Sequence, residues 1–531
     1  MATLQGLRNV FEPGALGKNH RLLVAVKWIA IVLVVLSFAK TLQNAPSNFD
    51  IELWDETNYL SDGISKTRPL FADYEDSGLY SAFYRVLSIF ISDPVDLYLY
   101  EANVIVFLTF LAVFACLAVL SRSYVFSSLA LGILLLSPAP TVWPRVSLAA
   151  IIILALTLMA ATAPRKTSAC FAILMLGAFL VSFVRPEFVL AFYTMAAAAA
   201  VAFSYEIWHS RSETMPGKNP LLYLSIAAVL LLSWVWSFPT LSTSERAFGA
   251  FGQHFALRIV MDNQLAIDPW TNWERITAVS FPEAKSLAQA FLVNPGLFTK
   301  HVFTNGLILV RNIFSDYIYP LVANFGFSRL LLAAVAGLYL VKIANNIIGG
   351  WRKVTPKAAR LASVRRRREF FGIATVVFLA PVILGCVIAA PRDHYVVVIV
   401  FLLFCLIALL VEKFQKLDHP LLLPAAGVAV LVVAPVIPVN PQETLSVVRQ
   451  LQAAAPHTTV MLEIDGGWCA YLKPPCESIW ATNYAADSEF QSFLYEKKID
   501  SIFVSPRLLE YAPIASDPHF RELISGPQKF A

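Results

Sequence analysis

Two adjacent carboxylates, Asp55 and Glu56, follow shortly after the first long apolar run, in the segment Trp54-Asp55-Glu56-Thr57. A carboxylate that apolar helices partly shield from water is suited to accept a proton from a hydroxyl group. The indole of Trp54 offers a flat surface that can pack against a sugar ring or a lipid. The pattern predicts a catalytic pair with Asp55 as general base. It also fits a solvated acidic loop, because several other carboxylates stand in the same segment.

Further charged groups occupy short turns between apolar runs. They are Arg185 with Glu187, Arg392 with His394 and Tyr395, and Arg145. An arginine can bind phosphate oxygens through paired hydrogen bonds, and a histidine beside it suits an anionic group. Each turn also fits a helix anchor at the membrane interface, where arginine and tyrosine side chains reach the headgroups. The sequence therefore predicts phosphate-binding residues here and leaves the anchoring alternative open.

Six cysteines occur in the chain, and Cys469 and Cys476 lie in a polar segment with two prolines between them. Such a pair forms a disulfide in an oxidising compartment. Zinc would need further ligands, and only His457 is near, so we favour the disulfide. The other four cysteines fall in apolar runs, where thiols pack as small hydrophobes. Whether the chain binds a divalent metal stays unknown from the sequence.

The composition predicts a lipid environment. Hydrophobic residues make up 57% of the 531 residues and charged residues only 15%, whereas soluble domains keep about 25% charged residues. The net charge is +5, but the basic residues sit in short stretches between apolar runs, as in cytoplasmic loops. We therefore expect the lipid bilayer, and no nucleic acid, as a partner. The arginine-rich stretch 352–368 fits a topology anchor or a patch for anionic lipids.

Apolar runs of about 20 residues can span a bilayer, and the chain holds about eleven candidates by this criterion. They are 22–42, 99–121, 124–139, 146–163, 168–184, 188–206, 220–238, 327–343, 370–389, 394–411 and 420–438. Basic residues favour the loops on one side, and the acidic loop after the first run falls on the other. This bias predicts a cytoplasmic amino terminus and a periplasmic or extracellular carboxyl terminus.

The predicted fold class is an α-helical polytopic membrane protein with a small C-terminal α/β extracytoplasmic domain. Residues 1–438 form the membrane domain, which carries the catalytic groups and the long outer loops 43–98 and 239–326. Loops of this length usually carry function. Residues 439–531 form the tail domain.

Periodicity predicts elements inside these outer segments. In the first loop, Tyr80, Phe83, Tyr84 and Leu87 share one helix face, as in a helix lying on a membrane surface. The second loop holds an amphipathic stretch around 286–293 and a mostly apolar run at 303–319, which is interfacial or re-entrant. The tail alternates helix and strand. Its predicted elements are a helix at 443–454, a strand at 459–464 that leads into Asp465-Gly466-Gly467, a helix at 489–498 and a strand at 501–504.

This layout resembles the GT-C superfamily of polytopic glycosyltransferases, which includes protein O-mannosyltransferases and aminoarabinose transferases of lipid A. Those proteins carry an acidic pair in the first outer loop, which Asp55-Glu56 in WDETNYL matches. The segments RPLFADYEDSGLYSAFYRVL, RPEFVL, NPGLFTKHVFTN and EKKIDSIFVSPRL are similar to segments of such proteins. The chain lacks the WWDYG motif of oligosaccharyltransferases, so transfer of a preassembled glycan to asparagine is not expected.

The resemblance implies a sugar donor linked to a polyprenyl phosphate and an acceptor hydroxyl on an envelope glycan, glycolipid or protein. Asp55 would deprotonate the acceptor, Glu56 would orient it or Asp55, and the sugar would be transferred with inversion. Arg185 or Arg392 would stabilise the departing phosphate. Some members use a divalent metal held by the acidic loop. The implied location is the inner (plasma) membrane, with the active site on the periplasmic side.

Two other function classes stay open. An O-antigen polymerase or ligase would also use undecaprenyl-linked glycans, but would depend on Arg246, His254 and Arg258 in the second outer loop. A transporter of lipid-linked sugars would need ionisable residues at mid-membrane depth, and the predicted spans offer almost none. No P-loop, dinucleotide-binding or hydrolase motif occurs in the chain.

Overall fold

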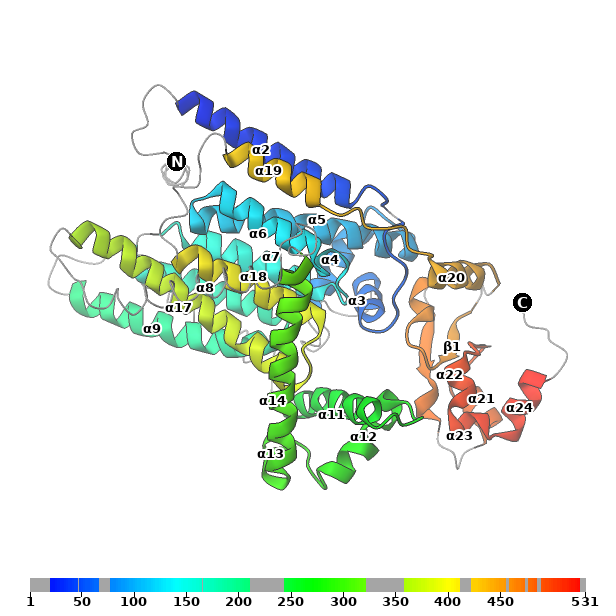
Figure 1. Cartoon of the computed structure of the whole chain (residues 1–531). Coiled ribbons are helices and arrows are strands. Elements are labelled where there is room, and N and C mark those ends of the chain that lie inside the picture. The colour runs from blue at the N-terminus through cyan, green and yellow to red at the C-terminus, as the bar shows by residue number, and fades with distance from the viewer. Residues whose placement is uncertain are drawn as a thin grey trace. The chain divides into compact units, whose positions relative to one another are not determined.

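The computed structural model describes residues 20–45, 47–65, 77–164, 166–210, 243–320, 358–410, 422–454, 458–472, 476–484 and 489–525 (Figure 1). Most of these residues are helical. Four helices are long and apolar enough to cross a membrane, namely Val24–Thr41, Pro94–Ser121, Pro186–Glu206 and Glu369–Ile388. Shorter apolar helices cover Tyr124–Leu136, Val146–Ala161, Thr167–Ser182, Asp393–Leu409 and Leu422–Val433. A helical protein with membrane-spanning helices and a small sheet agrees with the predicted class.

The predicted total of about eleven spans stays a prediction. The runs 220–238 and 327–343 lie outside the described residues, as do residues 352–357 of the arginine-rich stretch, whereas residues 358–368 form the start of helix α17 (Ala358–Ile388). The other runs coincide with the long and short apolar helices, whose ends differ from the predicted ends by a few residues.

The chain divides into two compact units. The first unit contains Met1–Thr41, Phe107–Val142 and Ser147–Val436, and the second contains Leu42–Val106, Trp143–Val146 and Ile437–Ala531. The second unit therefore joins the first long loop to the tail. Helix α5 (Pro94–Ser121) contributes residues to both units.

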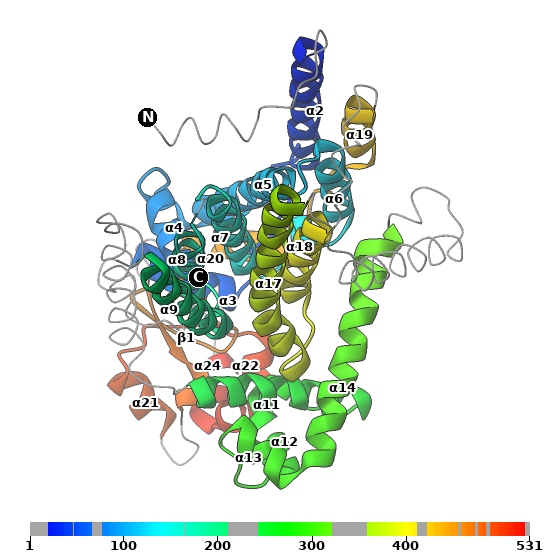
Figure 2. The ribbon, with the colours of Figure 1, turned by 90° about the vertical axis from the view of Figure 1, so that its left-hand side faces the viewer.

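In the first unit, helix α2 (His20–Thr41) lies beside α19 (Leu422–Val433), and α6 (Tyr124–Leu136) also contacts α19 (Figures 1 and 2). Gly427 permits this close approach, because a Cβ atom there would lie 3.0 Å from the Cβ of Leu33. The Lys40 ammonium donates to the carbonyls of Leu431 and Val432 at 3.0 and 3.1 Å. A cation at the carbonyl end of a helix is a stabilising arrangement.

The same unit contains further helices, which are α7 (Val146–Ala161), α8 (Thr167–Ser182), η3 (Pro186–Phe188), α9 (Val189–Ser210), α17 (Ala358–Ile388) and α18 (Asp393–Leu410). Figure 2 shows α8 beside α9 and α17 beside α18, and contacts join each pair. Of these helices, α7 and α8 are apolar around their whole circumference, as expected for helices in lipid or in a large core. The turns between the helices of this unit carry the predicted cations.

The second outer loop forms α11 (Thr243–Asp262), α12 (Pro269–Ser280), α13 (Leu287–Val293), α14 (Pro295–Asn312) and η4 (Ile313–Ile318). Buried Phe251, Phe255 and Phe281 pack into one cluster of the first unit. Side chains of Asp268, Ser286 and Asn294 accept hydrogen bonds from the first turns of α12, α13 and α14. Such caps satisfy backbone N–H groups that have no partner within the helix.

In the second unit, α3 (Asp55–Ile64) packs against α4 (Gly78–Ser88). The Arg85 guanidinium donates to the carbonyls of Asp62, Gly63 and Ser65, which closes the end of α3. Asp50 accepts from the backbone of Thr444 and Leu445, both at 2.8 Å, and so caps α20 (Glu443–Ala454). The first loop is therefore tied to the tail by hydrogen bonds from backbone N–H groups of α20 to the Asp50 carboxylate.

The tail forms a three-stranded parallel sheet in the order β2-β1-β3, with β1 at Val460–Glu463, β2 at Glu477–Trp480 and β3 at Ser501–Ile502. The sequence predicted β1, β3, α20 and α21 (Phe490–Glu496) near their observed positions but did not predict β2. Short helices complete the tail, which are η6 (Trp468–Tyr471), η7 (Ala481–Asn483), α22 (Pro506–Glu510), α23 (Ala512–Ala515) and α24 (Pro518–Ser525).

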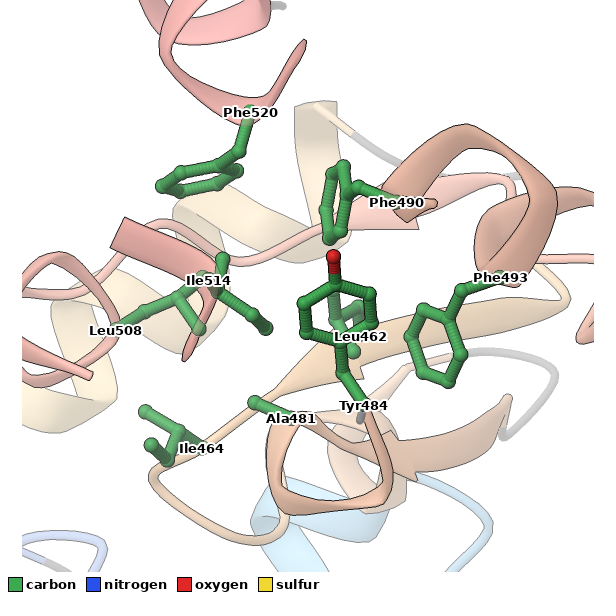
Figure 3. Packing of buried hydrophobic residues seen from close by; sticks show 9 residues of the cluster. All are labelled: Leu462, Ile464, Ala481, Tyr484, Phe490, Phe493, Leu508, Ile514 and Phe520. Carbon is green, nitrogen blue, oxygen red and sulfur yellow. The ribbon is translucent and has the colours of Figure 1, made fainter. Parts of the chain in front are cut away.

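The tail has its own hydrophobic core. Figure 3 shows the rings of Phe490, Phe493 and Tyr484 gathered beside Leu462 of strand β1, with Phe520 of α24 above them. All five side chains are buried. Burial of such aromatic side chains supplies most of the driving force for a small domain, so the sheet has a stable support.

Candidate functional site

A buried ion cluster lies within the second unit. Glu56 of α3, Glu101 of α5 and Arg145 are at most 3% exposed. The Arg145 Nε atom is 3.1 Å from a Glu101 oxygen, and its Nη2 atom is 3.6 Å from a Glu56 oxygen. The Arg145 backbone N–H also donates to Glu56 at 2.9 Å. Removing Arg145 from this buried set would leave the carboxylates without their cation.

Two tyrosines of α4 complete the cluster. The Tyr80 hydroxyl donates to Glu56 and to Glu101, the latter at 2.8 Å, and the Tyr84 hydroxyl lies 2.9 and 3.0 Å from the same two carboxylates. Burial and the two glutamates raise the pKa of both phenols well above the ordinary value. The phenols therefore stay protonated and act as donors. The predicted apolar face of this helix is turned into the protein at Tyr80 and Tyr84, because their hydroxyl groups have buried partners.

Arg145 keeps its charge in this setting. Burial alone would lower its pKa, but Glu56, two tyrosines and Glu101 raise it well above the ordinary value. Its guanidinium also lies 4.5 Å from the ring centroid of Tyr98. With both carboxylates already in contact, the guanidinium is engaged within the second unit. This geometry favours a positioning role for Arg145 over a phosphate contact, which stays a prediction.

Asp55 stands in a different environment from its neighbour. Asp55 is half-buried at the first residue of α3, whereas Glu56 and Thr57 are fully buried. Successive residues on a helix point about 100° apart, so one turn can present Asp55 outward while Glu56 faces inward. A carboxylate at a helix amino terminus also interacts favourably with the helix dipole.

The tail holds this first turn in place. Trp54 precedes α3 with φ of 75°, a rare value for a bulky residue, and its N–H donates to the Gly466 carbonyl at 3.1 Å. A Cβ atom on Gly467 would lie 2.3 Å from the Thr57 side chain. Thr57 and Tyr471 share a hydrogen bond of 3.1 Å. The glycine pair after β1 therefore lets the tail backbone approach α3 closely.

A buried carboxylate fixes the glycine turn itself. Glu463 ends strand β1 and accepts hydrogen bonds from the N–H groups of Gly467 and Trp468, both at 2.9 Å, and from the Ser478 hydroxyl. Burial raises the pKa of Glu463. Cys469, which follows this turn, is disulfide-bonded to Cys476. The turn is thus restrained by hydrogen bonds to the Glu463 carboxylate and by the disulfide at Cys469.

Trp54, the residue before Asp55, lies close to a second indole, Trp480. The ring centroids of Trp54 and Trp480 are 5.6 Å apart with an angle of 40° between the planes, and both side chains are half-buried. The Arg507 guanidinium lies 4.8 Å from the Trp54 ring centroid. Aromatic and cationic groups thus gather where α3 begins.

In the first unit, four of the predicted residues come together. Arg185 pairs with Glu187 at 2.9 Å, and its guanidinium lies 4.1 Å from the ring centroid of Tyr395. His394 is buried, with its ring centroid 4.4 Å from that of Tyr395. Arg392 is half-buried in the same turn. These contacts fit both a helix anchor and an anion site, so the phosphate-binding role stays a prediction.

A second polar group in the first unit involves α11 and α14. The Arg258 guanidinium contacts the Asn305 amide oxygen at 3.3 Å, and the Asn305 nitrogen lies 3.0 Å from the His301 Nε2 atom. Burial, followed by the charges of Arg392 and His301, lowers the pKa of His254 to about 4. Its Nδ1 atom has no hydrogen-bond partner among the residues that the structure describes. Because its pKa is lowered, His254 is neutral near pH 7.

Sequence reasoning missed Glu101, Tyr80, Tyr84 and Tyr98 as members of the cluster. Glu101 is the one carboxylate within the predicted run 99–121, and a charge inside an apolar span is a functional candidate by default. The position of this charge inside an apolar run could therefore have identified Glu101 as a candidate. The involvement of Tyr84 depends on which neighbour α4 faces, which no local pattern indicates.

Within the described part of the chain, no three histidine, cysteine or acidic side chains group in a way that could hold a metal ion. Comparison with models of protein families, with curated proteins and with solved structures gives no match.

Proposed function

We propose that the chain is a membrane glycosyltransferase that moves a sugar from a polyprenyl-phosphate donor to an acceptor hydroxyl. The observation that carries this proposal is the contrast between Asp55, half-exposed at the start of α3, and Glu56, which Arg145 and two tyrosines hold in the interior. A carboxylate on a rigid first turn is a suitable general base. The resemblance of the acidic loop to GT-C enzymes supports the same role.

In the proposed reaction, Asp55 accepts the proton of the acceptor hydroxyl, and the hydroxyl oxygen attacks the anomeric carbon of the donor sugar. A new carbon–oxygen bond forms, the bond to the phosphate oxygen breaks, and the configuration inverts. The electron pair of the broken bond leaves with the polyprenyl phosphate. Cations stabilise the charge that develops on this group, and Arg185 and Arg392 remain the sequence-based candidates.

The reaction is proposed to take place on the non-cytoplasmic side of the inner (plasma) membrane. The disulfide between Cys469 and Cys476 belongs to the same unit as α3, and disulfides persist in oxidising compartments. The acidic character of the loop around α3 agrees with the outer side under the positive-inside rule. The amino terminus is then cytoplasmic and the tail is extracytoplasmic.

The test uses purified full-length protein in nanodiscs with radiolabelled polyprenyl-phosphate sugars and an acceptor membrane extract. Asp55→Asn keeps the size of the side chain but removes the base, so we expect transfer to fall by about 100-fold or more. Glu510→Gln, the same type of change on the exposed surface of α22, serves as the matched control. Full transfer activity in Asp55→Asn, or none in the wild-type protein with any donor, would overturn the proposal.

A polymerase or ligase that uses undecaprenyl-linked glycans is the second candidate. The buried Nδ1 atom of His254 favours it, because this atom lacks a hydrogen-bond partner among the described residues. The positive charge of Arg392 also helps to lower the pKa of His254. A neutral imidazole can accept a proton. In the same assay, loss of activity in His254→Ala with full activity in Asp55→Asn would identify this alternative.

A further inference from the structure

The carboxyl edge of the tail sheet carries a group of side chains that the proposed reaction does not use. In open parallel α/β sheets, ligands bind beyond the carboxyl ends of the strands. Here β1 ends before Asp465-Gly466-Gly467, β2 ends at Trp480, and β3 is followed by the helix that holds Arg507. Asp465 is half-buried at this edge.

Trp54 lies at the same edge although it belongs to the first loop. Its N–H group donates to the Gly466 carbonyl. A Cβ atom on Gly466 would lie 2.7 Å from the Trp480 ring and 3.0 Å from the Trp54 ring. Gly466 also has a φ of 65°, which favours glycine. The glycine therefore allows two indoles to meet over the end of β1.

These indoles are not simply core residues. Each is half-buried, in contrast to the tail core, where Phe490, Tyr484 and Phe520 are at most 3% exposed. The two planes are inclined by 40°, so the rings do not cover one another face to face. Arg507 lies over the Trp54 ring, whereas no cation contact is recorded for the Trp480 ring among the described residues.

We propose that Trp480 and Trp54 form a saccharide-binding subsite at this edge and that the acceptor of the proposed reaction is therefore a glycan or glycolipid. The apolar face of a sugar ring packs on the indole of Trp480, and the Asp465 carboxylate accepts hydrogen bonds from ring hydroxyl groups. Trp54 directly precedes Asp55 in the chain, so a sugar bound here lies beside the proposed base. This role for the tail rests on the proposed function.

The residue types match the chemistry of a carbohydrate. A pyranose presents C–H groups on one face and hydroxyl groups at its rim, so it needs an aromatic surface with polar groups at the margin. Binding sites combine apolar walls with a few fixed polar groups in this way. The restraint of the glycine turn by Glu463 and by the disulfide reduces the ordering cost of binding.

Saturation-transfer difference NMR on full-length protein in nanodiscs tests the subsite without requiring turnover. The probes are the methyl glycosides of glucose, galactose, mannose and N-acetylglucosamine. We expect at least one glycoside to receive saturation from the wild-type protein. Trp480→Ala should weaken its binding by about tenfold, the size of a lost aromatic contact. Trp480→Phe should bind more strongly than Trp480→Ala because it keeps a ring.

Val504→Ala, a truncation of an exposed apolar side chain after β3, is the control and should bind like the wild type. Asp465→Asn should weaken glycoside binding without lowering the thermal midpoint. This second variant tests the subsite even if Trp480→Ala fails to fold. No saturation transfer to any of the four glycosides overturns the subsite. Equal binding by the wild type and a folded Trp480→Ala variant also overturns it.

Failure of the subsite and failure of the proposed function give different results. Asp55→Asn should still bind the glycoside, because the indoles are intact, while transfer is lost. Glycoside binding without transfer to any acceptor would support the subsite and contradict the transferase. Transfer to a serine-containing peptide without glycoside binding would support the transferase and contradict the saccharide acceptor.

Discussion

At the scale of single residues, the two members of the acidic pair lie in different environments. Asp55 and Glu56 are neighbours in the chain, but Glu56 is fully buried and Asp55 is half-buried. The sequence predicts that both carboxylates matter. It cannot indicate which one faces the interior, because that depends on Arg145, which lies far away in the sequence and contacts Glu56 only in the folded chain.

Arg145→Ala should strongly destabilise the protein. The change leaves Glu56 and Glu101 buried without their cation, and breaking such a set costs about 3–5 kcal/mol. The thermal unfolding midpoint in detergent measures the effect. Arg275→Ala, on the exposed surface of α12, is the matched control and should change the midpoint little.

Adding Glu101→Gln to Arg145→Ala should recover part of the loss, since one buried charge is then removed. A midpoint for Arg145→Ala equal to that of the control would contradict the cluster.

At the scale of elements, α4 illustrates the limit of periodicity. The spacing of Tyr80 and Tyr84 predicts a helix with one aromatic face, and that helix is present at Gly78–Ser88. Tyrosine carries both an apolar ring and a polar hydroxyl, so the pattern fits a membrane surface and a buried hydrogen-bond network equally well. Strand β2 escaped prediction because its sequence Glu477-Ser478-Ile479-Trp480 places two polar residues before two apolar ones and so shows no alternation.

Gly63→Ala should disturb the contact between α3 and α4. A Cβ atom at Gly63 would lie 2.5 Å from the Tyr84 Cβ and 2.8 Å from the Ser81 carbonyl. Overpacking of this kind costs about 1–3 kcal/mol, and the displaced Tyr84 hydroxyl should lose its contact with Glu56. The thermal midpoint and the rate of sugar transfer should therefore both fall.

Gly306→Ala provides the comparison, because a Cβ atom there meets nothing within 4 Å and alanine favours a helix. That variant should be neutral or slightly more stable. An unchanged midpoint in Gly63→Ala would show that the helices can move apart at no cost.

At the scale of the whole molecule, the proposed function depends on the side of the membrane that α3 faces. The loop charges predict the outer side. Helix α5 has 28 residues, so it is about 42 Å long, which exceeds the roughly 30 Å hydrocarbon core. Glu101 near its amino-terminal end can therefore lie outside the hydrocarbon.

Cysteine labelling in intact cells tests this orientation. Asn58→Cys, at an exposed position of α3, should react with a membrane-impermeant maleimide without permeabilisation. Arg122→Cys, exposed between α5 and α6, is expected on the cytoplasmic side and should react only after permeabilisation. Background should be low, because Cys116, Cys170, Cys386 and Cys405 are buried. Labelling of Asn58→Cys only after permeabilisation would rule out the proposed reaction.

The sequence by itself determined the helical membrane class, the positions of most elements and the acidic pair, because hydrophobic runs, charge bias and periodicity are local properties of a chain. Only the tertiary structure decided that Glu56 is paired with Arg145 and Glu101, and that Trp54 meets Trp480 over Gly466. These contacts join residues from distant parts of the sequence. They form because buried charges and glycine turns are stable only where the folded chain brings their partners, and no local pattern specifies that pairing.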